Sequence, residues 1–167
     1  MIVGGIANAV WGVARNTFDI DIIIDVEDDD LEKTIKKLTA NFITSVENPV
    51  GFVKKFRVLP IRNSQGFLLD IIFAALEFEK AAIERAREQN LGGIKAIICS
   101  PEDLVILKII SNRRKDQEDV AGIIKIRGDS LDRKYLDKKI RELALWLDRS
   151  DIVDFYEQCW NQFKNRH

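Results

Sequence analysis

The stretch "GGIANAVWGVARNTFDIDIII", residues 4–24, decides the fold of this chain. Its end alternates aspartate with isoleucine and then becomes wholly apolar, which predicts a strand over residues 19–26. Side chains alternate between the faces of a strand, so Asp19 and Asp21 share one face while the intervening isoleucines face the core. Two neighbouring carboxylates repel each other unless a cation lies between them. The stretch therefore indicates a cation site on a buried strand.

A third carboxylate stands alone in the apolar run "FLLDIIF", residues 67–73. Burying an unpaired carboxylate is costly, so Asp70 needs a partner. One interpretation pairs it with a cation of the neighbouring predicted strand: Lys54, Lys55 or Arg57. The other places it beside Asp19 and Asp21, where three carboxylates would bind Mg²⁺ or Mn²⁺, because these ions prefer oxygen ligands. Two such ions about 3.5–4 Å apart can clamp both oxygens of a phosphoryl transfer.

Gly4 and Gly5 lie between a strand stub at residues 1–3 and a helix predicted over residues 6–14. Glycine lets the backbone approach a phosphate closely, and the first amides of a helix are unpaired donors at its positive end. A Gly-Gly pair is common in ordinary turns. Its place about 15 residues before two strand aspartates is what indicates a phosphate cradle.

Composition excludes several classes of protein. The 167 residues are 46% hydrophobic and carry a net charge of −1, which favours a compact domain with no global attraction to nucleic acid or membranes. The single histidine is His167, so an internal histidine base or ligand is excluded. Cys99 and Cys159 lack the spacing of a disulfide framework or zinc site. No apolar run approaches the ~20 residues that span a bilayer. We expect a cytoplasmic protein without a membrane partner.

The rest of the chain predicts an α/β (α+β) fold: a small mixed sheet, flanking helices and a C-terminal helical part. Residues 51–61 and 67–73 read as an antiparallel hairpin, and residues 94–99 as a short strand. Ser100 and Pro101 mark a helix start. The helices are expected over residues 28–40, 77–90 (closed by Gly92 and Gly93), 100–112, 115–126 and, as a pair joined near residues 149–150, 131–164. We expect two domains, residues 1–98 and 99–167.

Residues 4–21 resemble the opening motif of the DNA polymerase beta-like nucleotidyltransferase superfamily. That motif is a GS or GG turn, a helix, and then G-x-x-R-x-T-x-D-h-D. The matching residues are Gly4, Gly5, Gly12, Arg15, Thr17, Asp19, Ile20 and Asp21. The third acid of the family matches Asp70. The resemblance implies the same mixed-sheet fold.

Residues 100–124 resemble a helical pattern of the small prokaryotic branch related to abortive-infection and toxin–antitoxin nucleotidyltransferases. In that pattern a lysine on one helix precedes a K/R-D-x-x-D element on the next. The matching residues are Lys108, Arg113, Lys115, Asp116 and Asp119. The two matches together cover roughly residues 3–125, and residues after them match no pattern that we can use.

The resemblance implies transfer of a nucleoside monophosphate from an NTP to a hydroxyl, with release of pyrophosphate. Asp19, Asp21 and Asp70 would be the catalytic and metal-binding residues. Nucleotide-binding roles would fall to Gly4, Gly5, Arg15, Thr17, Lys108 and Asp116. The residues themselves leave plainer roles open: Arg15 neutralising the acids, Lys108 reaching solvent from an apolar helix, and Asp116 pairing with a nearby arginine.

Three hypotheses follow. The first is a metal-dependent nucleotidyltransferase acting on tRNA, protein or a small molecule, as the toxin-like half of a two-gene module with an antitoxin-like partner. The second is a nucleotide-binding or partner-binding module that keeps the fold without activity. It is motivated by the first predicted strand, which begins at Met1, whereas many relatives carry a helix before that strand. The third is an antibiotic-modifying nucleotidyltransferase.

Overall fold

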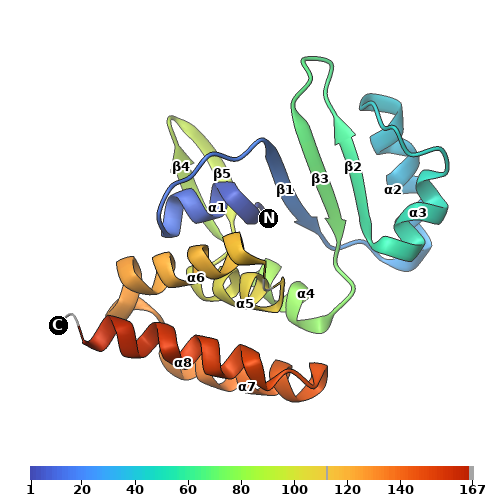
Figure 1. Ribbon diagram of the computed structural model, residues 1–167. Coiled ribbons are helices and arrows are strands. Elements are labelled where there is room, and N and C mark those ends of the chain that lie inside the picture. The colour runs from blue at the N-terminus through green and yellow to red at the C-terminus, as the bar shows by residue number, and fades with distance from the viewer. Residues whose placement is uncertain (112, 166–167) are drawn as a thin grey trace. The chain divides into compact units, whose positions relative to one another are not determined.

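The computed structural model describes residues 1–111 and 113–165 (Figure 1). Asn112, where one helix was predicted to end, and His167, the single histidine, lie outside these residues. The chain divides into two compact units. The first contains Met1–Ile6 and Asn16–Cys99, and the second contains Ala7–Arg15 and the described residues from Ser100 onward.

A three-stranded mixed sheet forms the centre of the first unit (Figure 1). It contains β1 (Asp19–Ile24), β2 (Val58–Arg62) and β3 (Leu68–Phe73), in the order β1-β3-β2. β1 runs parallel to β3, whereas β2 and β3 form an antiparallel pair. The predicted hairpin and the predicted α+β class with a small mixed sheet are therefore confirmed.

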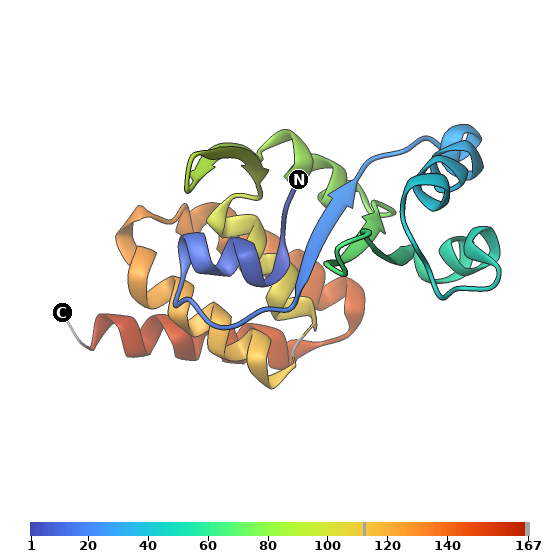
Figure 2. The same cartoon turned by 90° about the horizontal axis from the view of Figure 1, so that it is seen from above.

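Helices α2 (Asp28–Asn41) and α3 (Pro49–Phe56) cover one face of this sheet, as Figure 2 shows from above. The apolar residues of α2 recur at helical spacing and form one face of the helix. Its first turn carries three aspartates, whose charge suits the positive end of a helix. Seven buried residues make the core between the helices and the sheet: Leu31, Ile35, Val53, Leu59, Ile61, Ile71 and Phe73.

The helix α3 corrects the prediction that residues 51–61 are wholly β. The alternating segment "FVKKFRV" suggested a strand, but the residues before it are a helix start. The Asn48 side chain accepts a hydrogen bond from the Gly51 amide at 3.0 Å, and Pro49 occupies the first turn. The helix ends at Arg57, which adopts the left-handed conformation (φ 55°) before β2 begins.

A second correction concerns residues 77–90, which were predicted to be one helix. The helix α4 spans Glu77–Glu84, and β4 (Arg87–Leu91) follows and pairs antiparallel with β5 (Ile94–Ile98). Gly92 and Gly93, at φ +61° and +95°, form the turn of this hairpin rather than the end of a helix. Two successive residues with positive φ are typical of a tight hairpin turn.

Residues 1–3 connect the two sheets of the first unit. Ile2 forms isolated bridges with Ile22 on β1 and Ile98 on β5, which agrees with the predicted strand stub. The Val3 amide donates to the Asp21 carbonyl at 2.9 Å. Helix α1 (Gly4–Trp11) begins directly after this pairing, so its first residues lie beside Asp21.

The second unit is helical, and its helices agree with the predicted ones. They are α5 (Pro101–Ser111), α6 (Arg114–Arg127), α7 (Arg133–Leu147) and α8 (Ser150–Lys164), with a 3-10 turn, η1 (Gly128–Ser130), between α6 and α7. The Ser100 hydroxyl accepts a hydrogen bond from the Asp103 amide at 3.1 Å and so caps α5. In the described part of the chain, no helix has the length and apolar character that crossing a membrane requires.

Candidate metal centre

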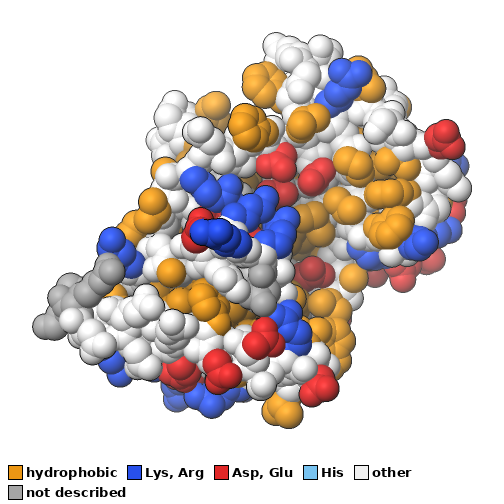
Figure 3. All heavy atoms as spheres, in the orientation of Figure 1, with side chains coloured by type: hydrophobic (Ala, Val, Ile, Leu, Met, Phe, Trp, Pro, Cys, Tyr) orange, Lys and Arg blue, Asp and Glu red, His pale blue; other side chains and the backbone are white. Residues whose placement is uncertain are grey.

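Three carboxylates meet on the sheet of the first unit. Asp21 on β1 lies directly opposite Asp70 on β3, and Asp19 lies opposite Leu68. Each aspartate offers an oxygen within 4.8 Å of the others, and all three side chains are half-buried. Figure 3 shows acidic side chains gathered over β1 and β3. Among the residues that the structure describes, this is the one group of three acidic, cysteine or histidine ligands close enough to hold a metal ion.

Asp70 has no ion-pair partner in residues 1–111 and 113–165. The three cations considered as its partners make other contacts. Lys54 pairs with Glu32 at 2.8 Å, and Arg57 donates to the Ala74 carbonyl at 2.9 Å. The ammonium of Lys55 lies 5.1 Å from the centre of the Phe56 ring. Burial, and then the charge of Asp19, raise the pKa of Asp70 above its ordinary value. A cation held between the carboxylates would relieve the repulsion between Asp19 and Asp70. The oxygen donor set fits a hard divalent cation.

Gly4 lies against the carboxylate of Asp21. It has φ +63°, and a Cβ atom built at this position would lie 1.7 Å from Asp21 Oδ2. No side chain fits there, and the left-handed backbone also disfavours one. The first residue of α1 is therefore a glycine because the carboxylate lies on the space that a side chain would fill.

Gly5 lies against Thr17 in the same way. A Cβ atom at Gly5 would lie 2.5 Å from Thr17 Oγ1. The Thr17 hydroxyl donates to Asp19 Oδ1 at 2.9 Å, so it holds one of the three carboxylates in place. Gly4 and Gly5 at the start of α1, together with Thr17 and the aspartates, thus form one packed group.

Arg15 and Lys108 belong to the second unit, where they share a carboxylate. Arg15 donates to both oxygens of Asp119, at 2.9 and 2.8 Å. The ammonium of Lys108 donates to Asp119 at 2.6 Å and to Asp116 at 3.3 Å, and Lys108 is only 5% exposed. The structure therefore shows Lys108 buried between two carboxylates.

Asp116 receives two further hydrogen bonds, from the Ser111 hydroxyl at 2.8 Å and from the Arg113 guanidinium at 2.6 Å. Burial would raise the pKa of Asp116 and of Asp119, but hydrogen bonds from their cationic partners outweigh it and lower both pKa values. Both acids are therefore held ionised. Lys115, the remaining residue of the matched pattern, is exposed on α6.

A pocket of about 210 Å³ opens beside two of the three aspartates. Sequence reasoning missed its other walls, because they come from the loop after α2 and from β2 and meet only through tertiary pairing. Arg62 and Ile43 exchange backbone hydrogen bonds at 2.8 and 2.9 Å, which brings that loop to the edge of β2. The pocket is lined by Asp19, Ile43, Ser45, Pro60, Ile61, Arg62, Leu68 and Asp70.

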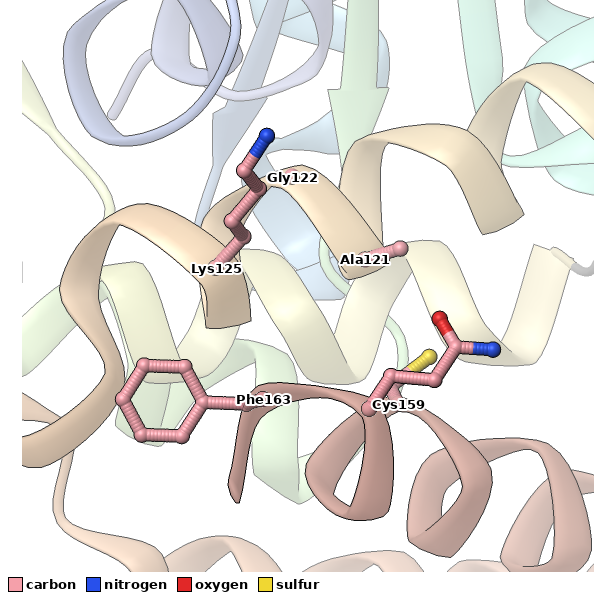
Figure 4. A pocket seen from close by; sticks show the side chains of 6 residues that line it. Ala121, Gly122, Lys125, Cys159 and Phe163 are labelled. Atoms are coloured by element: carbon pink, nitrogen blue, oxygen red, sulfur yellow. The ribbon is translucent and has the colours of Figure 1, made fainter. Parts of the chain in front are cut away.

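A second pocket, of about 160 Å³, lies within the helical unit between α6 and α8 (Figure 4). Burial raises the pKa of the Cys159 thiol to about 11, so this cysteine is a poor nucleophile at neutral pH. The side chain of Lys125 extends away from Cys159 (Figure 4). The described residues of this pocket provide no carboxylate and no activated group.

The comparison with protein families is informative over the whole chain. Residues 1–167 match the model of a family described as "Nucleotidyltransferase of unknown function (DUF6036)". No protein with curated annotation matches the chain.

The matching solved structures include two at low identity. An antigenic nucleotidyltransferase-like protein from Paracoccidioides brasiliensis is 18% identical, with 93% of this chain and 83% of that chain covered and a TM-score of 0.49. A lincosamide antibiotic adenylyltransferase, LnuA, with bound lincomycin, is 15% identical, with 75% of this chain and 85% of that chain covered and a TM-score of 0.46.

Proposed function

Because the chain belongs to this family of nucleotidyltransferases of unknown function (DUF6036), we propose that it transfers a nucleoside monophosphate from an NTP to a hydroxyl acceptor. The observation that carries the proposal is the group of three carboxylates, Asp19, Asp21 and Asp70, on adjacent strands. Their oxygens are close enough to share metal ions, and Asp70 has no ion-pair partner within the described residues.

Asp19, Asp21 and Asp70 would hold Mg²⁺ or Mn²⁺. When bound, such ions supply positive charge that stabilises the oxygens of a phosphoryl group in transfer. Thr17 orients Asp19 through its hydroxyl, and Gly4 leaves room for the Asp21 carboxylate. These contacts fix two of the three ligands before an ion arrives, which favours tight and specific binding.

The glycine turn would hold the triphosphate. The first amides of α1 have no partner within the helix, and they are adjacent to Asp21 through the pairing of residues 1–3 with β1. Amides at a helix N-terminus favour anions. We assign the β- and γ-phosphates to Gly4 and Gly5 on this basis. Lys108 is a weaker candidate for this role, because it is buried in its own ion pairs.

The transfer is a substitution at the α-phosphorus. The acceptor oxygen forms a bond to this phosphorus, and the bond to the oxygen that bridges the α- and β-phosphates breaks. Pyrophosphate leaves with that oxygen, and the hydroxyl proton passes to the carboxylate of Asp70. No other reactant is needed.

Incubation of the protein with Mg²⁺ and α-labelled NTPs tests the proposal. The acceptor panel contains tRNA, protein lysate and aminoglycosides, and released pyrophosphate is measured in parallel. We expect label on one acceptor class, with equal pyrophosphate release, and loss of both with Asp19→Asn and Asp21→Asn. Glu47→Gln, an exposed change in the same unit, is the control and should retain activity. Equal transfer by the Asp variants would exclude this site as the catalytic centre.

A nucleotide-binding module without activity is the second candidate. The burial of Lys108 favours it, because that lysine is not available as a phosphate ligand in this structure. It predicts Mg²⁺-dependent NTP binding with no pyrophosphate release. A role as the toxin-like half of a two-gene module, with an antitoxin-like partner, would follow from the first candidate if tRNA or protein is the acceptor.

A further inference from the structure

The two sides of the carboxylate group differ. The sheet order is β1-β3-β2, and residues 1–3 pair with β1 on the side away from β3. Gly4 therefore contacts the group from the β1 side, whereas the pocket with Arg62 lies on the β3–β2 side. The pocket contains Asp19 and Asp70 but not Asp21. A ligand in this pocket would reach the carboxylates from the β3–β2 side, whereas Gly4 contacts them from the β1 side.

Apart from Asp19 and Asp70, the pocket is lined by apolar side chains with one cation, Arg62, and one hydroxyl, Ser45. Ile43 and Leu68 remain 49% and 50% exposed, and Pro60 lies directly opposite Asp70 in the strand register. The cation is Arg62, which is exposed. Its guanidinium makes no ion pair with any described residue, although two carboxylates line the same pocket. An unpaired guanidinium beside apolar walls suits a ligand that has both an anionic group and a flat apolar part.

Two exposed aromatic side chains stand at the same end of the sheet. Phe18 is 87% exposed and directly precedes Asp19. Phe67 is 61% exposed and precedes Leu68, which is the register partner of Asp19. Neither phenylalanine lines the pocket itself. Exposed aromatic residues near the end of a strand pair are nevertheless suited to stacking on the bases of single-stranded nucleic acid or of a nucleotide. Figure 3 shows apolar side chains beside the acidic group on this face.

We propose that this pocket binds the acceptor and that the acceptor is a nucleotide, either unattached or at the end of an RNA strand. Its ring packs on Ile43 and Leu68, its phosphate pairs with Arg62, and its hydroxyl points towards Asp70. The inference rests on the proposed function and names the substrate class for it. With metal ions on Asp19 and Asp70, as the proposed function has them, Arg62 is the remaining charge of the pocket. It would then repel a cationic acceptor, and a neutral acceptor would leave that guanidinium unpaired.

The test compares acceptors that differ in one feature. They are a short single-stranded RNA with a 3′ hydroxyl, a nucleoside monophosphate, the same nucleoside without phosphate, a protein lysate and an aminoglycoside. We expect transfer to the phosphate-bearing acceptors. Arg62→Gln should raise the KM for that acceptor about tenfold, as loss of one charge-assisted hydrogen bond predicts, and leave the Kd for NTP unchanged. Arg87→Gln, an exposed arginine on β4, is the matched control and should change neither.

The two phosphate-bearing acceptors identify the source of the nucleotide. Preferred transfer to the RNA, weakened by Phe18→Ala, indicates a strand whose bases stack outside the pocket. Preferred transfer to the monophosphate, unaffected by Phe18→Ala, indicates an unattached nucleotide. Equal transfer to the nucleoside without phosphate, or transfer only to protein or aminoglycoside, would overturn the inference. So would an Arg62→Gln variant that weakens NTP binding rather than acceptor use.

A binding measurement separates this inference from the proposed function. The probe is a fluorescent RNA with a 3′-deoxy end, which cannot react, and its anisotropy is recorded with wild-type protein, Arg62→Gln and Arg87→Gln. Binding that falls about tenfold only in Arg62→Gln supports the pocket assignment even if no acceptor releases pyrophosphate. Pyrophosphate release together with equal probe binding by all three proteins would overturn the pocket assignment and leave the transfer activity standing.

Discussion

At the scale of single residues, the backbone conformation of Gly4 bears on the candidate metal site. A Cβ atom at this position would lie on the Asp21 carboxylate, and the φ of +63° is one that other residues adopt at a cost. Glycine at position 4 is thus required for two reasons, the space taken by the Asp21 carboxylate and the positive φ.

Replacing Gly4 with alanine should therefore displace the Asp21 carboxylate. We expect metal affinity to fall about tenfold or more and the free energy of unfolding to fall by about 1–2 kcal/mol from backbone strain. Gly92→Ala is the control, because Gly92 has nearly the same φ, +61°, with no atom within 4 Å of the added Cβ. Calorimetric metal titration and chemical unfolding measure both effects. A Gly4→Ala protein with unchanged metal affinity would contradict this account.

Asp70 illustrates the cost of keeping a carboxylate in the site. Its pKa is raised in the folded protein, so without metal its ionisation costs stability. This cost is absent below the ordinary carboxyl pKa, where Asp70 is protonated in the folded and the unfolded protein. Stability is lost as pH rises through the raised pKa of the folded protein.

Asp70→Asn should therefore raise the Tm of the metal-free protein at pH 7, and the gain should shrink as pH falls towards about 4. The same variant should lose the increase in Tm that Mn²⁺ gives the wild type. Thermal unfolding with and without metal measures both. Glu47→Gln serves as the control for loss of one exposed carboxylate. A lower Tm for metal-free Asp70→Asn would show that Asp70 has a stabilising partner.

At the scale of helices, the buried charges of α5 and α6 join segments far apart in the sequence. Arg15 binds Asp119 across 104 residues, and Lys108 connects the two helices through Asp116 and Asp119. Removing one member of such a group leaves a buried charge without compensation.

Lys108→Met should therefore cost about 3–5 kcal/mol of unfolding free energy at pH 7. Lys115→Met, an exposed change on α6, should stay within about 0.5 kcal/mol of wild type. The lowered pKa values of Asp116 and Asp119 mean that the wild type loses stability as pH falls through them. The variant should instead gain stability on mild acidification, because its unpaired carboxylates become protonated. Normal stability with lost NTP binding would show that Lys108 is a triphosphate ligand.

Helices and strands could be predicted where the residues within the element itself determine its conformation. The alternation at Asp19–Ile24 and the lone Asp70 in an apolar run are local signals, and the structure places both in the sheet. The segment at Pro49–Phe56 carried conflicting local signals, and the cap at Asn48 outweighed the alternation. The hairpin at Gly92–Gly93 was missed because a Gly-Gly pair also ends helices.

The residues of the candidate site could likewise be predicted only where they share a local sequence pattern. The three aspartates were predictable from their spacing and the family resemblance. Arg62, Ser45 and Ile43 were not, because the loop and the strand that carry them meet only through tertiary hydrogen bonds. The partners of Lys108 were named as part of a pattern, but their burial with Arg15 depends on a contact across the whole chain.

At the scale of the molecule, the sequence does not divide at a single point. Helix α1 begins in the first unit and ends in the second, so the segment Ala7–Arg15 packs with described residues from Ser100 onward. Trp11 and Asn8 are buried there, and a Cβ atom on Gly12 would lie 2.9 Å from Ile123. The predicted division into a core of residues 1–98 and a helical region of residues 99–167 remains a prediction.

A chain cut after Cys99 should not fold to a native state, because it exposes the apolar residues of α1 and leaves Arg15 without Asp119. We expect an aggregated or loosely packed product by near-UV circular dichroism and hydrogen exchange. A matched chain cut after Arg149, which keeps α5 and α6 but loses α8, separates this effect from that of truncation itself. A cooperative unfolding transition for residues 1–99 would contradict this expectation.

The most direct test of the central claim is a Mn²⁺ titration followed by electron paramagnetic resonance, with and without a non-hydrolysable NTP. We expect Mn²⁺ to bind the wild type, more tightly when the nucleotide is present, and to bind the double variant Asp19→Asn, Asp21→Asn about hundredfold more weakly. Equal Mn²⁺ binding by the wild type and the double variant, or nucleotide binding that does not depend on metal, would contradict it.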